Sequence, residues 1–95
     1  GLYKVSMEEN NLSDLQELMI ITMEECGELI QECSKSIRCN NYYNNKKLTE
    51  EVGDVIYMIE LLHKYDLISW NEVYERGMIK KEKLKKWSKL ESEKG

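Results

Sequence analysis

Residues 24–30, with the sequence EECGELI, are echoed 26 positions later by residues 50–56, with the sequence EEVGDVI. In each copy an acid is followed by two spacers, the second of them a glycine, and then by another acid and apolar residues. Acids three positions apart share one face of a helix, where like charges repel each other. Two such sites on neighbouring helices would destabilise the helix pair, but their carboxylates are well suited to coordinate a hard divalent cation.

The composition around these motifs favours an all-α chain. Its 95 residues include no proline and no phenylalanine, and 41% of them are hydrophobic. Without proline to interrupt helices, long helical segments are favoured. A chain of this length forms one small domain with a modest core, and association would supply further burial. We therefore expect a single helical domain over residues 1–95, with flexible ends at 1–12 and 91–95.

The first motif lies on a long predicted helix. Ser13 and Gln16 have the spacing of a capping box, and the helix should end near Cys39. Residues 40–45 contain four asparagines, which favour turns, so this segment is predicted to be a loop. Apolar residues form a helical stripe along the first helix, in which Cys26 and Cys33 are expected to be small core residues with reduced thiols. The stripe consists of Leu15, Leu18, Met19, Met23, Cys26, Leu29, Ile30, Cys33 and Ile37.

The second motif lies on a helix predicted from Lys46 or Thr49 to Tyr65. Its apolar residues are spaced four and three apart, as in a helix-packing seam formed by Leu48, Val52, Val55, Ile59 and Leu62. Because the loop before it is short, the two long helices should be antiparallel. On oligomerisation they are expected to pack into a four-helix-bundle-like core.

A third helix is predicted after a short connection at residues 66–68. Ser69 and Glu72 have the spacing of another capping box. This last part of the chain is basic, because residues 76–95 hold eight basic and three acidic side chains, whereas residues 1–75 hold six and fifteen. The basic end could face an anion, with Lys80 and Lys83 the best-placed lysines, or it could complement the dipole of the last helix.

The acids are expected at the edge of the apolar seams. On a helical wheel Glu51 and Asp54 flank the seam of the second helix, and Glu25 and Glu28 have the same relation to the first. Carboxylates with no nearby histidine suit Mg²⁺, or Mn²⁺ in its place. Gly27 and Gly53 cost helix stability, which suggests close approach of the backbone to a partner helix or a ligand.

The paired motif resembles that of the MazG-like, all-α nucleoside triphosphate pyrophosphohydrolases. Their signature is E-x-x-E followed, after one to two dozen residues, by E-x-x-D, and here it falls on Glu25, Glu28, Glu51 and Asp54. The resemblance covers about residues 15–65. It implies Mg²⁺-dependent cleavage of a (deoxy)nucleoside triphosphate between the α and β phosphates, in a homodimer or homotetramer that clears unwanted nucleotides.

The resemblance also implies roles for single residues. Glu25, Glu28, Glu51 and Asp54 become metal ligands, and Glu25 also belongs to the catalytic group. Glu24 becomes a catalytic acid that orients or deprotonates the attacking water. We assign Lys80 and Lys83 to the phosphates, where they would stabilise the departing pyrophosphate.

Other functions remain open at this level. The same acids could be inherited by a non-catalytic helical dimerisation or partner-binding module, or the fold could act on phosphoribosyl-ATP or an alarmone. No apolar run approaches the ~20 residues of a membrane span, and no signal peptide is recognised, so a cytoplasmic protein without a membrane partner is expected. The lysine run lacks interleaved aromatics and the whole chain is acidic, so no nucleic-acid partner is expected.

Overall fold

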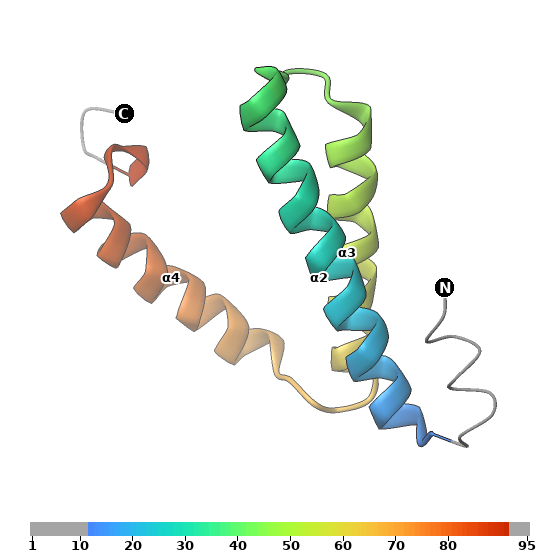
Figure 1. The fold of residues 1–95 in the computed structure, drawn as a ribbon. Coiled ribbons are helices and arrows are strands. Elements are labelled where there is room, and N and C mark those ends of the chain that lie inside the picture. Colours follow the sequence, from blue (N-terminus) through green and yellow to red (C-terminus); the bar gives the residue numbers. More distant parts are fainter. Residues whose placement is uncertain (1–11, 92–95) are drawn as a thin grey trace. The chain divides into compact units, whose positions relative to one another are not determined.

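The computed structural model describes residues 12–91, and all its regular elements are helices (Figure 1). They are α2 (Asp14–Cys39), α3 (Lys46–Lys64), α4 (Trp70–Trp87) and the short 3₁₀-helix η1 (Lys89–Glu91). The predicted all-α fold class is confirmed, since no strand occurs in the described part. The predicted flexible ends, 1–12 and 91–95, lie outside the described residues except at Leu12 and Glu91.

The chain divides into two compact units, of which the first ends at Leu62 and the second begins at His63. The first unit is a helical hairpin, in which α2 and α3 lie side by side in opposite directions (Figure 1). That arrangement agrees with the antiparallel pair predicted from the short loop. The second unit holds α4 and η1. A single domain over residues 1–95 stays a prediction.

The start of α2 has the predicted capping box. The Gln16 backbone N–H donates to Ser13 Oγ at 3.1 Å, and the Ser13 backbone N–H donates to Gln16 Oε1 at 3.0 Å. Two otherwise unpaired donors are thereby satisfied. The capping box predicted at Ser69 was wrong. Ser69 does precede α4, but its side chain makes no cap hydrogen bond. Its backbone carbonyl accepts a helical hydrogen bond from Val73 N–H at 3.0 Å.

Asn45 holds the loop end of the hairpin together. Its Oδ1 accepts from the Leu48 backbone N–H at 3.0 Å, which caps α3. Its Nδ2 donates to Ser36 Oγ at 2.9 Å and to the Asn41 carbonyl at 3.0 Å. Both Asn45 and Ser36 are buried. One amide therefore links the last turns of α2 to the first turn of α3 and fixes the distance between the two helices at this end.

The packed seam differs from the one predicted. On α3 the predicted seam is wrong at Val52, which is exposed, whereas Glu51 and Met58 are buried. The observed seam is therefore rotated toward the acids. Seven-residue spacing still describes both inner faces, which consist of Leu18, Thr22, Glu25, Leu29, Glu32 and Ser36 on α2, and of Leu48, Glu51, Val55, Met58 and Leu62 on α3.

The predicted apolar stripe of α2 lies mostly outside this seam. Only Leu18 of the stripe is buried, and Leu29 is half-buried. Cys26 and Cys33 are free thiols as predicted, but their assignment to the core was wrong for this hairpin, because both are exposed.

A Cβ atom added at Gly27 or Gly53 would meet nothing within 4 Å. The close helix approach predicted at these glycines is therefore absent from the described residues.

In the second unit, aromatic rings cluster around the start of α4. Trp70 lies with its ring centroid 5.3 Å from that of His63 and 6.1 Å from that of Tyr74. Near the end of the helix, Lys80 Nζ lies 5.3 Å from the ring centroid of Trp87, a cation–π contact. Among the described helices none has the length and apolar character needed to cross a bilayer.

Replacement of Asn45 tests its role in the hairpin. We expect Asn45→Ala to lower the free energy of unfolding by about 1–2 kcal/mol, because an N-cap and the bond to Ser36 are lost together. Ser69→Ala is the matched control. It removes a hydroxyl that makes no cap bond, and it should change stability by less than about 0.5 kcal/mol. Urea unfolding followed by far-ultraviolet circular dichroism measures both, and equal losses would contradict the assigned role.

Candidate metal centre

The hairpin brings four predicted ligands together. Glu25 and Glu28 of α2, with Glu51 and Asp54 of α3, each offer a carboxylate oxygen, and these four oxygens lie within 4.8 Å of one another. Each pair is three residues apart on its own helix and therefore points from one helical face. Because the helices run side by side, the two faces meet, as the paired motif predicted.

Glu51 is the buried member of the group. The residue is only 3% exposed, although the other three members of the group are half-buried or exposed. Its Oε1 lies 3.0 Å from Lys47 Nζ, one helical turn earlier on α3. Its Oε2 is buried and has no hydrogen-bonding partner in the described part of the chain. An ionised oxygen without a partner is costly to bury, so this position requires a positive charge or a proton.

Two acids on α2 also have a buried carboxylate oxygen without a hydrogen-bonding partner. Glu24 Oε2 and Glu25 Oε2 are buried and lack a hydrogen-bonding partner among the described residues. Glu24 lies next to Glu25 in the chain but does not belong to the group of four. Unsatisfied oxygens on neighbouring acids are typical of sites that bind a cation or a proton.

The surroundings of this site raise the pKa values of two of its carboxyl groups. Burial, followed by the charges of Glu28 and then Asp54, raises the pKa of Glu25 above its usual value. The pKa of Glu28 is raised first by the hydrogen bond that its protonated form can share with the neighbouring Glu51 carboxylate, and then by desolvation. The pKa of Lys47 is also raised, first by its hydrogen bond to Glu51. Among the described residues, Lys47 offsets part of the charge of this acidic group.

The donor set fits a hard divalent cation. All four candidate ligands are carboxylates, and two of the four lie within the seam between the helices. Mg²⁺ and Mn²⁺ prefer oxygen ligands, whereas zinc sites mostly contain histidine or cysteine. The unpartnered Glu51 oxygen provides an additional reason for a cation here.

The comparisons with known proteins identify the family. The model of the MazG nucleotide pyrophosphohydrolase domain matches residues 13–88, which include both acidic motifs. The chain belongs to the MazG family. Neither the curated proteins nor the solved structures gave a match. The matched range extends beyond the α2–α3 hairpin and covers the whole of α4.

The other predicted site residues lie in the second unit of this MazG-family chain. Lys80 and Lys83 are on α4 and both are exposed. Their contact with phosphate stays a prediction. Sequence reasoning missed Lys47, which is paired with a candidate ligand. Its position four residues before Glu51 was the available signal, because such pairs meet on a helix surface.

The raised pKa values predict how stability depends on pH. Glu25 and Glu28 hold protons more firmly in the folded chain, so their contribution is complete below the ordinary value of 4.5 and is lost as the pH rises through their folded-state pKa values. We expect the free energy of unfolding in a chelator to fall through these two groups as the pH rises above the ordinary value of 4.5. Urea unfolding at several pH values measures the slope.

Glu28→Gln is the control for this slope, because it removes one of the two titrating groups while keeping the shape of the side chain. Its slope should be shallower than that of the wild type, and saturating Mg²⁺ should flatten the wild-type slope as well. Lys47 adds no slope in this range, because the stabilisation from its raised pKa is complete below about 10.5 and is lost only as the pH rises above that value. Identical slopes for the wild type and Glu28→Gln would show that the pKa of Glu28 is not raised in the folded chain.

Proposed function

We propose that this chain is a Mg²⁺-dependent pyrophosphohydrolase that cleaves nucleoside triphosphates between the α and β phosphates. The products would be a nucleoside monophosphate and pyrophosphate. The observation that supports this best is the group of four carboxylates with the buried, unpartnered Glu51 oxygen at the α2–α3 seam. Membership of the MazG family supports the same reaction class. The proposed cellular role is removal of unwanted nucleotides in the cytoplasm.

In this proposal Glu25, Glu28, Glu51 and Asp54 hold Mg²⁺, which Mn²⁺ can replace. The bound ion would supply charge neutralisation for the phosphates and a lowered pKa for a water molecule. Glu24 is proposed to orient the attacking water and accept its proton, with Glu25 beside it in the catalytic group. The buried, unpartnered Oε2 of Glu24 supports this role. Lys80 and Lys83 are proposed to stabilise the charge on the phosphates.

A panel of nucleotides tests the function. With Mg²⁺, the wild type should release pyrophosphate from at least one (deoxy)nucleoside triphosphate. The panel also includes phosphoribosyl-ATP and an alarmone as alternative substrates. Glu28→Gln and Asp54→Asn should lower the rate at least a hundredfold, because the metal loses a ligand. Glu60→Gln changes an exposed acid of α3 outside the group and should leave the rate unchanged. If the wild type hydrolyses no nucleotide on the panel, the proposed enzyme activity is wrong.

A second candidate, a non-catalytic partner-binding module, is motivated by the exposed apolar face of the hairpin. This module would tolerate Glu51→Gln and Asp54→Asn without loss of binding to its partner. Its thermal stability would also be insensitive to Mg²⁺. The proposed enzyme activity predicts the opposite result, which is a Mg²⁺-dependent rise in melting temperature that is lost in both variants.

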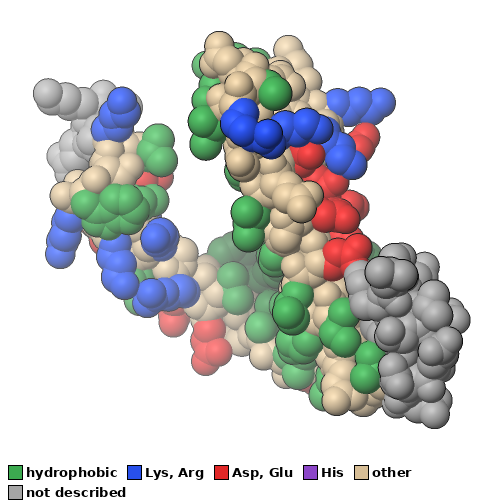
Figure 2. All heavy atoms as spheres, viewed as in Figure 1, with side chains coloured by type: hydrophobic (Ala, Val, Ile, Leu, Met, Phe, Trp, Pro, Cys, Tyr) green, Lys and Arg blue, Asp and Glu red, His purple; other side chains and the backbone are tan. Residues whose placement is uncertain are grey.

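We also propose that the chain is a homodimer or homotetramer, in which a second copy covers the outer face of α2. Apolar side chains gather along one side of α2, whereas acidic ones lie along the other (Figure 2). On this face Met23 is 72% exposed and Ile30 is 68% exposed. Only Leu18 and Met58 are buried apolar residues in the described part of the chain, which is a small core for a stable fold.

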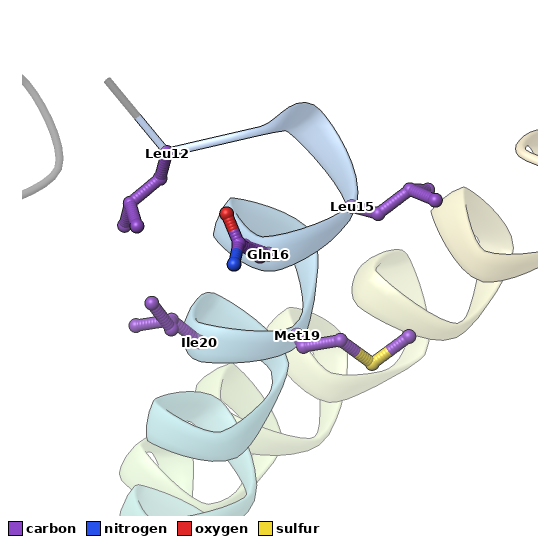
Figure 3. Close-up of a pocket in the computed structure, with 5 residues that line it drawn as sticks. All are labelled: Leu12, Leu15, Gln16, Met19 and Ile20. Atoms are coloured by element: carbon purple, nitrogen blue, oxygen red, sulfur yellow. The ribbon is translucent and has the colours of Figure 1, made fainter. Parts of the chain in front are cut away.

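The outer face has the spacing of a packing seam. Met19, Met23, Cys26, Ile30, Cys33 and Ile37 repeat with intervals of four and three residues. The same surface continues into an open apolar depression of about 350 Å³ at the start of α2, lined by Leu12, Leu15, Gln16, Met19 and Ile20 (Figure 3). A second copy presents the same pattern, so the two faces would be complementary in an isologous contact.

A charge on this face tests the oligomer. We expect Ile30→Asp to shift the wild-type dimer or tetramer toward the monomer, because an ionised side chain would be buried at the contact. Gln31→Asp introduces the same charge at the neighbouring exposed residue, outside the four-three repeat, and should leave the mass unchanged. Light scattering coupled to size-exclusion chromatography gives the mass of each. A monomeric wild type would contradict the proposal.

A further inference from the structure

A polar pocket of about 130 Å³ lies at the loop end of the α2–α3 hairpin. It is lined by residues from the last turns of α2, the loop and the first turn of α3, among them Glu32, Lys35, Ser36, Asn45 and Lys47. Its volume corresponds to about four water molecules at liquid density. None of the residues proposed to hold the metal ion, the attacking water or the phosphates lines this pocket.

The floor of the pocket is built from buried polar side chains. Asn45 and Ser36 are both more than nine-tenths buried, and they are joined by a hydrogen bond of 2.9 Å. Ser36 Oγ also donates to the Glu32 carbonyl at 2.8 Å. These bonds hold both helices at fixed positions around the pocket. Its shape is therefore set by the same contacts that set the hairpin.

The pocket adjoins the carboxylate group along both helices. On α3, Lys47 lines the pocket while its Nζ lies 3.0 Å from Oε1 of Glu51. On α2, Glu32 lines the pocket one helical turn beyond Glu28, a rise of about 6 Å. A group that bridges the pocket and the metal centre therefore has to span only about one turn of helix.

The charge of the pocket depends on the metal centre. Lys35 and Lys47 contribute two positive charges, and the positive end of the α3 dipole lies at the same place. Glu32 opposes them, and Glu51 neutralises Lys47. When Glu51 shares its charge with a divalent cation, Lys47 is less neutralised and the pocket becomes more positive. An anion that enters here should therefore bind together with the metal ion.

We propose that this pocket binds the β and γ phosphates of the substrate, and hence the pyrophosphate product. Lys47 and Lys35 would be the contacting residues of the hairpin, in addition to the proposed contribution of Lys80 and Lys83. The inference rests on the proposed function and specifies where the leaving group lies. Lysine ammonium groups form strong charge-assisted hydrogen bonds with phosphate oxygens. Lys47 then has two partners in succession, since it pairs with Glu51 before the metal ion binds and with phosphate afterwards.

Calorimetric titration with pyrophosphate in saturating Mn²⁺ tests the proposal on the full chain. The variants are Lys47→Met and Lys35→Met, each of which removes one charge from the pocket. Lys46→Met is the matched control, because Lys46 is the adjacent exposed lysine on α3 and does not line the pocket. Far-ultraviolet circular dichroism verifies the fold of each variant, and if Lys47→Met fails to fold, Lys35→Met provides the same test.

Wild type and Lys46→Met should bind pyrophosphate with equal affinity and only when the divalent cation is present. Lys47→Met should bind it at least tenfold more weakly and Lys35→Met severalfold more weakly, because each loses a charge-assisted hydrogen bond. Mn²⁺ alone should bind to Lys47→Met at least as tightly as to the wild type, since a competing positive charge has been removed. A residue that merely positions Glu51 would instead weaken Mn²⁺ binding.

Three results would overturn the inference. They are equal pyrophosphate affinity in Lys47→Met, Lys35→Met and Lys46→Met, full affinity without the divalent cation, and a parallel loss of Mn²⁺ and pyrophosphate binding in Lys47→Met. None of these measurements requires turnover. If the wild type binds pyrophosphate as described but hydrolyses no nucleotide, the subsite stands and the proposed reaction fails. If nucleotides are hydrolysed and Lys47→Met retains normal pyrophosphate affinity, the reaction stands and the subsite fails.

Discussion

The structure depends on one carboxylate that is buried between two helices. Glu51 occupies a seam position of α3 where a packed helix pair normally has a leucine or a valine, and it is almost fully buried. Glu25 takes a corresponding position on the inner face of α2. A seam with acids on both sides stabilises a helix pair only if positive charge or protons compensate them. Lys47 provides part of this compensation from the α3 side.

The register of the two helices decides whether the acids meet. One residue of helix corresponds to a rotation of about 100° and a rise of about 1.5 Å, so a small slip would separate the carboxylates. Asn45 prevents the slip by bonding to Ser36 of α2 and to the first turn of α3. The loop is therefore part of the site's architecture, although it contributes no ligand. Its left-handed residues, Asn40 and Asn44, are of a type that adopts positive φ with little strain.

Local chemistry made most of the fold predictable. The Ser13 capping box, the asparagine loop and the bounds of α2 and α3 follow from residues that interact with near neighbours in the chain. The grouping of Glu25, Glu28, Glu51 and Asp54 was also predictable, because helical spacing and a short loop leave few alternatives. The roles of these acids as metal ligands remain proposals.

The side of each helix that is buried could not be predicted in the same way. A hydrophobic pattern places the apolar stripe inside, and on α2 this reasoning assigned Cys26 and Cys33 to the core. The hairpin instead buries a neighbouring stripe that contains acids and a serine, and it leaves the apolar one exposed. Periodicity gives the spacing of a stripe but does not say which of two stripes faces the neighbouring helix. The burial of Glu51 depends on that choice.

The two stripes of α2 have the same four-three spacing and are displaced by one residue. The inner stripe starts at Leu18 and ends at Ser36, and the outer one starts at Met19 and ends at Ile37. They therefore lie about 100° apart around one helix. Any helix packed on the outer stripe would restrain α2 on two sides, and the position of Glu25 and Glu28 would be fixed from both. Since four like charges at short distance favour separation of the helices, burial on the outer stripe opposes the repulsion on the inner one. Association and cation binding would then stabilise the same helix pair, and each would strengthen the other.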